Sequence, residues 1–193
     1  MVLRWLQCVG LLSCCALCGC GSSPPTRFYI LNEIAPSAAA PLSASSIAVR
    51  VEPPALAPEI DRSELVTRSG PNRVHVAGSQ RWAAPLRGQI RRVISDDLAA
   101  RLAPGLVADP DEPATNEPRR TLTIAIEEFY GDDRCAVSLR AGWSLANPRV
   151  NVLHGSEQVQ IPGSAPCSGE LPAAMSRALA VLADRLAQVI AAN

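Results

Sequence analysis

The sequence predicts an α/β domain with a mixed β-sheet covered by helices. Three observations lead to this prediction. Short apolar runs with strand-like alternation recur along the chain, two longer stretches carry apolar residues at helical spacing, and the two kinds of segment interleave. Residues 20–193 are enough for one domain with its own core.

An export signal is predicted over residues 1–19. Arg4 supplies a short positive region, and the apolar run that follows ends at Leu17, short of the about 20 apolar residues that span a bilayer. The pair Gly19-Cys20 resembles the lipobox of bacterial lipoproteins, because a small residue precedes the cysteine and Leu17 lies three positions before it. We expect cleavage before Cys20 and acylation of its thiol, which anchors the chain in a membrane. An ordinary cleaved signal with incidental cysteines is the alternative.

Residues 20–27 are expected to form a lipidated tether, and residues 28–193 the domain. In enteric-type sorting, an aspartate after the lipidated cysteine retains a lipoprotein at the inner membrane. By resemblance, Gly21 favours the periplasmic face of the outer membrane. The seven residues from Gly21 to Arg27 reach at most about 25 Å when fully extended. The domain is therefore expected to stay close to the bilayer.

The first part of the domain predicts strands. Phe28–Leu31 and Ile47–Val51 are apolar runs of strand length, separated by a stretch rich in Ala, Ser and Pro from Ala35 to Ser46. Leu65–Arg68 and Arg73–Val76 flank a four-residue turn and predict a hairpin.

Two amphipathic helices are predicted, one from Pro85 to the Pro104-Gly105 pair and one from about Pro172 to near the C-terminus. In both, apolar residues recur at helical spacing while charged residues fall on the other side. Between them we expect strands over residues 121–126, 136–145 and 150–161.

Cys135 and Cys167 are the only cysteines beyond the tether. In an oxidising periplasm an even pair is most simply a disulfide, which closes a loop of about 33 residues and contributes roughly 3 to 4 kcal/mol in the loop-entropy model. Two free buried thiols, or metal ligands together with His154, are the alternatives. No C-x-x-C spacing supports the metal alternative.

No catalytic pattern is evident. The G-x-S-x-G, P-loop and Rossmann patterns do not occur. His75 and His154 lie in predicted strands and are expected to be structural or surface residues. The adjacent pairs Glu127-Glu128 and Asp132-Asp133 predict no acid–base pair, because neighbours in a strand face opposite sides, so a solvated strand end and a turn are the preferred interpretation. We expect no enzyme activity and no metal, nucleotide or haem.

The charge balance, 18 Lys+Arg against 18 Asp+Glu, provides no net field that would attract nucleic acid. Arg81-Trp82 is the most unusual local feature. Trp and Arg are favoured at interfaces, so the pair is a candidate partner contact. In the alternative interpretation, Trp82 holds the start of the following helix on the core.

The chain resembles the PqiC family of ABC-type transport auxiliary lipoproteins. The resemblance covers most of the mature chain and depends on the order and spacing of four segments. These are Phe28-Tyr29-Ile30-Leu31, Asp61-Arg62 followed by Leu65-Val66-Thr67-Arg68, Arg81-Trp82-Ala83-Ala84-Pro85-Leu86, and the final amphipathic helix. Ala84 departs from the family, which often has an acidic residue there, so any contact made by that acid is missing here.

The resemblance implies a three-layer α/β/α domain on a mixed sheet and a non-enzymatic role in phospholipid transport. It implies a periplasm-spanning MCE-domain protein as the partner, and a homo-oligomeric ring at the outer membrane. A structural or assembly lipoprotein that supports lipopolysaccharide export or envelope tethering is the second hypothesis. A lipid-active hydrolase is the third, and no residue supports it well.

Overall fold

The computed structural model describes residues 24–36, 41–42, 47–109, 112, 119–147, 150–163 and 171–193. The predicted signal, the lipidation site Cys20 and Cys167 lie outside these residues. In the described part, no helix is both long enough and apolar enough to cross a membrane.

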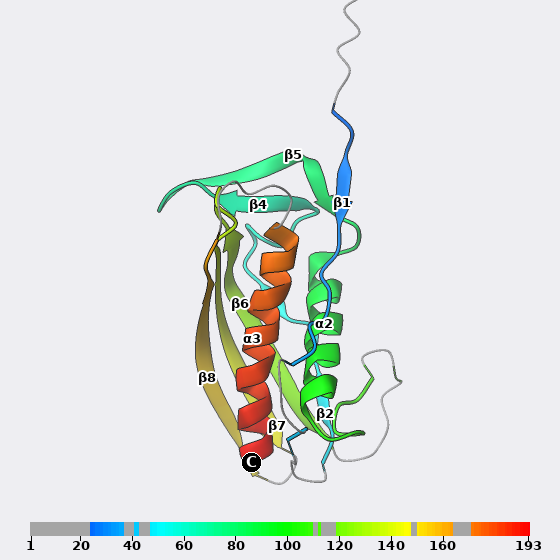
Figure 1. The fold of residues 1–193 in the computed structure, drawn as a ribbon. Helices are drawn as coiled ribbons and strands as arrows, with labels where there is room; N and C mark the ends of the chain where they lie inside the picture. Colours follow the sequence, from blue (N-terminus) through cyan, green and yellow to red (C-terminus); the bar gives the residue numbers. More distant parts are fainter. Residues whose placement is uncertain are drawn as a thin grey trace, which may run out of the picture.

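One mixed, eight-stranded sheet organises the domain (Figure 1). Its strands follow the order β1 (Arg27–Tyr29), β5 (Val74–Trp82), β4 (Glu64–Arg68), β6 (Arg120–Gly131), β7 (Val137–Asn147) and β8 (Val150–Ile161). The short strands β2 (Val49–Val51) and β3 (Ala55–Leu56) pair in parallel with β6, and β4 meets the end of β6 through Thr67 and Gly131. Three short strands therefore follow one another along one edge of β6, while β7 occupies its other edge.

The two described helices, α2 (Leu86–Arg101) and α3 (Leu171–Ala192), pack side by side on one face of the sheet (Figure 1). The core lies between them and the strands. The opposite face of β8 carries exposed side chains at alternate positions: Val152, His154, Ser156, Gln158 and Gln160. This one-sided burial follows the period-two pattern of an antiparallel sheet whose second face meets water.

The predicted α/β class and the mixed sheet are confirmed. A second helical layer, which the resemblance implies, is not among the described elements. Both predicted helices and the predicted strands are present, with β5 and β6 longer than expected and β3 additional. Because β3 has only two residues, it carries too little pattern to be recognised in the sequence.

β6 continues through Glu127-Glu128 to Gly131, where a strand end was expected. A register shift between Ile126 and Glu128 marks a bulge. Glu127 and Glu128 both lie 2.9 Å from the Arg140 guanidinium, so the simple alternation expected for this pair does not hold. The two carboxylates form an ion-pair cluster at the bulge.

The domain has two opposite ends along α3. At one end Leu171 packs on Gly131, close to β1 and the β4–β5 hairpin. At the other end the fully buried Arg120 donates to the carbonyl of Ile190, 2.9 Å away, in the last turns of α3. A cation there complements the negative end of the helix dipole.

Candidate functional site

The predicted tether leads to the end of the domain at which β1 joins the sheet. β1 pairs in parallel with the end of β5, with Phe28 opposite Arg81 and Tyr29 opposite Trp82. The backbone carbonyl of Tyr29 then accepts a hydrogen bond from Ala83, 2.8 Å away. The first ordered strand is thereby fixed to the sheet at the start of the α2 segment.

After β1 the segment Leu31–Ile34 runs over the helices. We call this segment, together with the helix side chains that bind it, the N-terminal clamp. These side chains are Gln89, Arg92, Asp97 and Arg101 on α2 and Ser176 on α3. No strand lies beside this segment in the described part of the sheet. Its backbone groups are instead satisfied by side chains, as buried backbone groups require.

Three backbone amides of the clamp donate to helix side chains. The amide of Leu31 donates to Gln89 Oε1 at 2.8 Å, and that of Ile34 donates to Asp97 Oδ1 at 2.8 Å. Asn32 donates to the hydroxyl oxygen of Ser176 at 3.2 Å, which connects the segment to the second helix.

Two arginines bind the carbonyls of the same segment. Arg92 donates to the Leu31 oxygen at 2.8 Å and Arg101 to the Ile34 oxygen at 3.2 Å. Donors and acceptors of the segment are therefore both engaged, and its position relative to the helices is fixed.

Asp97 and Arg101 form a buried charge pair beneath the clamp. Asp97 is fully buried, and its Oδ1 lies 3.3 Å from Arg101 Nη1. Burial raises the pKa of Asp97 to about 6, against the lowering effects of the Ile34 amide and the Arg101 charge. Arg101 also contacts Asp184 on α3, so the pair connects both helices.

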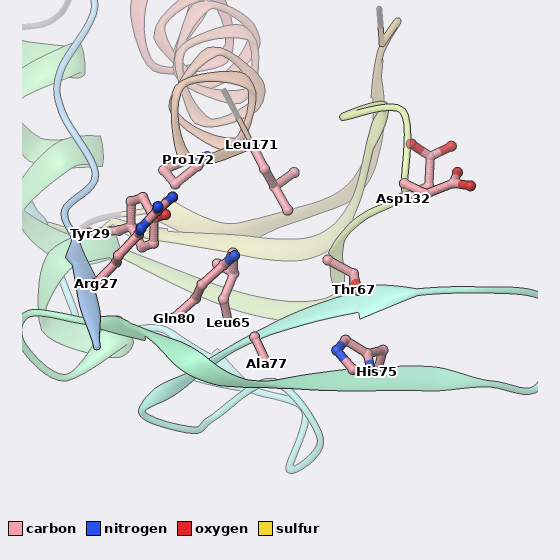
Figure 2. A pocket seen from close by; sticks show the side chains of 11 residues that line it. Arg27, Tyr29, Leu65, Thr67, His75, Ala77, Gln80, Asp132, Leu171 and Pro172 are labelled. Atoms are coloured by element: carbon pink, nitrogen blue, oxygen red, sulfur yellow. The ribbon is translucent and has the colours of Figure 1, made fainter. Parts of the chain in front are cut away.

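A cavity of about 470 Å³, here called the β1 pocket, lies beside this entry point (Figure 2). Its wall comes from β1, the β4–β5 hairpin, the β6–β7 turn and the start of α3. The lining residues are Arg27, Tyr29, Leu65, Thr67, His75, Ala77, Gln80, Asp132, Asp133, Leu171 and Pro172. Its apolar floor with polar groups around it suits an amphiphilic group.

Glycine at position 131 allows one part of this wall to form. A Cβ at Gly131 would lie 2.0 Å from Cδ1 of Leu171, too close for any real pair of carbon atoms. Glycine therefore leaves the space that the Leu171 side chain occupies, and any larger residue at position 131 would have to displace that side chain.

The titratable groups of the β1 pocket include one with a clear structural role. Asp132 Oδ1 accepts hydrogen bonds from the amides of Arg134 and Ala136, at 2.9 and 2.8 Å. This carboxylate closes the turn between β6 and β7, as Asp often does in turns. His75 lies exposed in β5, and His154 lies exposed in β8 outside the pocket. Within the described residues no three His, Cys, Asp or Glu side chains cluster as metal ligands do.

The two residues of the candidate partner contact, Arg81 and Trp82, differ in burial. Trp82 is 5% exposed and belongs to the core, and its amide donates to the Ser63 carbonyl at 2.8 Å. This is the placement that the helix-entry alternative expects. Arg81 is exposed, and its guanidinium lies 3.6 Å from Glu64. A partner contact through Arg81 stays a prediction.

The outward face of β1 was not recognised in the sequence. Tyr29 packs against the core, whereas Phe28 and Ile30 are 66% and 53% exposed. The run Phe28–Leu31 predicts a strand but does not show which of its side chains meet water, because all four residues are apolar or aromatic.

Ala84 marks the departure from the family pattern. Its carbonyl accepts a hydrogen bond from Gln89 Nε2 at 2.8 Å, just before α2 begins. The same Gln89 binds Leu31, so one side chain connects the entry of the helix to the clamp.

A family model for the ABC-type transport auxiliary lipoprotein component matches residues 29–187. The chain belongs to this family of ABC-type transport auxiliary lipoproteins. The match runs from Tyr29, the last residue of β1, through the clamp, α2 and the other strands to Ala187 in α3. The resemblance read from the sequence is thereby confirmed.

Solved structures share the fold of this auxiliary lipoprotein. The crystal structure of an uncharacterized protein has a TM-score of 0.73 and 18% identity, covering 86% of this chain and 99% of that chain. A protein from Xanthomonas campestris, assigned to family DUF330, has a TM-score of 0.68 and 18% identity, covering 86% and 95%. At such identities the likeness concerns the fold. No curated protein matches the sequence significantly.

Proposed function

We propose that this auxiliary lipoprotein is anchored through acylated Cys20 at the periplasmic face of the outer membrane. There it serves an ABC-type system that moves phospholipid across the envelope with an MCE-domain protein. The family membership supports a role as a non-catalytic component of a transport system. The sequence around Cys20 supports palmitoylation or a related acylation, and Gly21 supports the outer-membrane location.

The observation that carries this proposal is the N-terminal clamp. A domain on a long free linker could act anywhere in the periplasm. Here the chain becomes fixed at β1, which begins seven residues after Cys20, and the residues after β1 are bound to both helices. The proposed anchor would therefore hold the domain close to the bilayer and limit its tilt, which suits a docking component at the end of a transport path.

We further propose that several copies assemble into a ring that receives the MCE protein. The exposed strand β1 lies at the end of the described sheet order, and Arg81 lies beside it. Strand edges are frequent sites of association. The ring would place several anchors and several β1 pockets around one opening.

We also propose the disulfide between Cys135 and Cys167. Cys135 is 3% exposed, and its expected partner lies outside the described residues. Gly163 supports the pairing, because a Cβ there would lie 2.1 Å from the Arg134 carbonyl oxygen. The chain thus passes against the residues that flank Cys135 four positions before Cys167.

The test is crosslinking in cells followed by purification of the tagged, full-length protein and identification of its partners. We expect an MCE-domain protein and transport subunits, together with crosslinked homo-oligomers. The matched control is Cys20→Ser, which should move the protein to the periplasmic wash and abolish these crosslinks. An outer-membrane barrel or peptidoglycan as the main partner would contradict the transport role and favour a structural lipoprotein.

A further inference from the structure

Phe28 in β1 and Ile30, the first residue after β1, carry two large apolar side chains that the fold does not bury. Phe28 and Ile30 are two residues apart, so they extend from the same side of the chain. They are 66% and 53% exposed, while Tyr29 between them packs on the core. Single exposed apolar residues are ordinary, whereas Phe28 and Ile30 place two large apolar side chains on the same side of the chain.

The fold also prevents this face from turning inward. Tyr29 is paired with Trp82 in the sheet, and the clamp begins at Leu31, whose amide and carbonyl are bound by Gln89 and Arg92. The strand therefore cannot rotate to bury Phe28 without breaking contacts on both sides. Its apolar face is held outward.

An arginine borders this face. Arg81 is the register partner of Phe28, and its side chain is 46% exposed. One nitrogen of its guanidinium lies 3.6 Å from Glu64. The other N–H groups of the guanidinium can bind phosphate. An aromatic side chain flanked by arginine is the composition found where proteins meet the headgroup region.

The length of chain before β1 decides which partner fits. Phe28 follows Cys20 by eight residues, which extend at most about 29 Å, and Pro24-Pro25 lies between them. The bilayer that holds the lipid is thus never more than about this distance from Phe28, and a less extended tether brings the two into contact. The other end of α3, a helix of 22 residues, lies about 33 Å from Leu171 along the helix axis.

We propose that Phe28 and Ile30 insert into the interfacial layer of the bilayer that holds the anchor, with Arg81 at the level of the phosphates. This inference rests on the proposed acylation of Cys20. The insertion gives the domain a second point of attachment beside its lipid, which fixes its orientation and turns the β1 pocket toward the membrane surface.

The test uses the full-length lipidated protein in vesicles of phosphatidylethanolamine and phosphatidylglycerol, some with brominated acyl chains. Phe28→Trp places a fluorescent reporter on the outward face, read as the difference from the parent protein. Val152→Trp is the matched control, since Val152 is 47% exposed but lies near the start of β8, at the opposite end of the domain. Ile30→Trp provides a second reporter where Phe28→Trp does not fold.

We expect a blue shift and strong bromine quenching for Trp at 28 or 30, and neither effect at 152. Equal quenching at 152 would overturn the proposal, because it indicates general adsorption. Absence of quenching in protein that floats with the vesicles would overturn it too, and would leave the proposed transport role intact. A blue shift that depends on protein concentration in detergent would show that a second copy covers the face. Failure to float at all would refute the anchoring itself.

Discussion

The carboxylate of Asp97, one turn before the end of α2, accepts a hydrogen bond from the backbone amide of Ile34, 63 residues earlier, at 2.8 Å. This bond connects the segment next to the membrane tether with a buried ion pair between the helices. Burial raises the pKa of this carboxylate to about 6, so a titratable group lies directly beneath the segment that follows the tether.

We predict that Asp97→Asn changes the pH dependence of stability. The native pKa of Asp97 lies above its ordinary value of 3.8, so this group stabilises the fold fully below about pH 4 and loses that contribution as pH rises through about 6. The asparagine variant should lack this part of the slope, while its Oδ1 can still accept from Ile34. Urea unfolding between pH 4 and pH 7 measures the difference from the parent protein, and parallel curves would contradict the assignment.

Gln89→Ala should loosen the clamp. The change removes an acceptor for the Leu31 amide and a donor to the Ala84 carbonyl, leaving backbone groups without partners. We expect a loss of about 1 to 3 kcal/mol in the free energy of unfolding, and faster amide exchange at residues 31–34. Gln158→Ala on the exposed face of β8 is the control and should change stability by no more than about 0.5 kcal/mol. Unchanged exchange in the clamp of the Gln89 variant would count against its role.

Gly131→Ala should disturb the wall of the β1 pocket. The new methyl group would lie 2.0 Å from Cδ1 of Leu171, so either the side chain or the start of α3 must move. We expect a loss of about 1 to 3 kcal/mol. A second change, Leu171→Ala, should cost less in this variant than in the parent. Gly142→Ala, where no atom lies within 4 Å of the added carbon, serves as the control. Equal effects at both glycines would refute the steric explanation.

Substitution of Trp82 should affect stability, whereas substitution of Arg81 should affect association. Trp82→Ala removes a side chain that is 5% exposed and should cost about 3 to 5 kcal/mol. Arg81→Ala removes one side of an exposed ion pair and should cost less than about 1 kcal/mol. Thermal unfolding checks both values. If Arg81 contacts a partner, its variant should lose crosslinks while remaining folded.

The proposed disulfide predicts that the mature protein shows no free thiol under denaturing, non-reducing conditions. Replacing both Cys135 and Cys167 by alanine should lower stability by about 3 to 4 kcal/mol through the larger entropy of the unfolded chain. Thiol titration and urea unfolding test the two statements. Two titratable thiols in protein kept under oxidising conditions would disprove the pairing.

The sequence by itself predicted the α/β class, the helices, the strands and the family, because each depends on short-range patterns. Alternation in residues 121–126 and helical spacing after Pro85 identify buried faces without knowledge of their neighbours. The family resemblance likewise depends on the order of segments such as Phe28-Tyr29-Ile30-Leu31 and Arg81-Trp82, which can be read directly from the sequence.

Only the tertiary structure decided how these pieces meet. The clamp joins Leu31 to Gln89 and Asn32 to Ser176, contacts between residues 58 and 144 positions apart, which no local pattern specifies. The same holds for the choice between Phe28 and Tyr29 as the exposed side chain. Within a fully apolar run, the partner strand and the packing of the helices determine which side faces water, and those exist only in the folded chain.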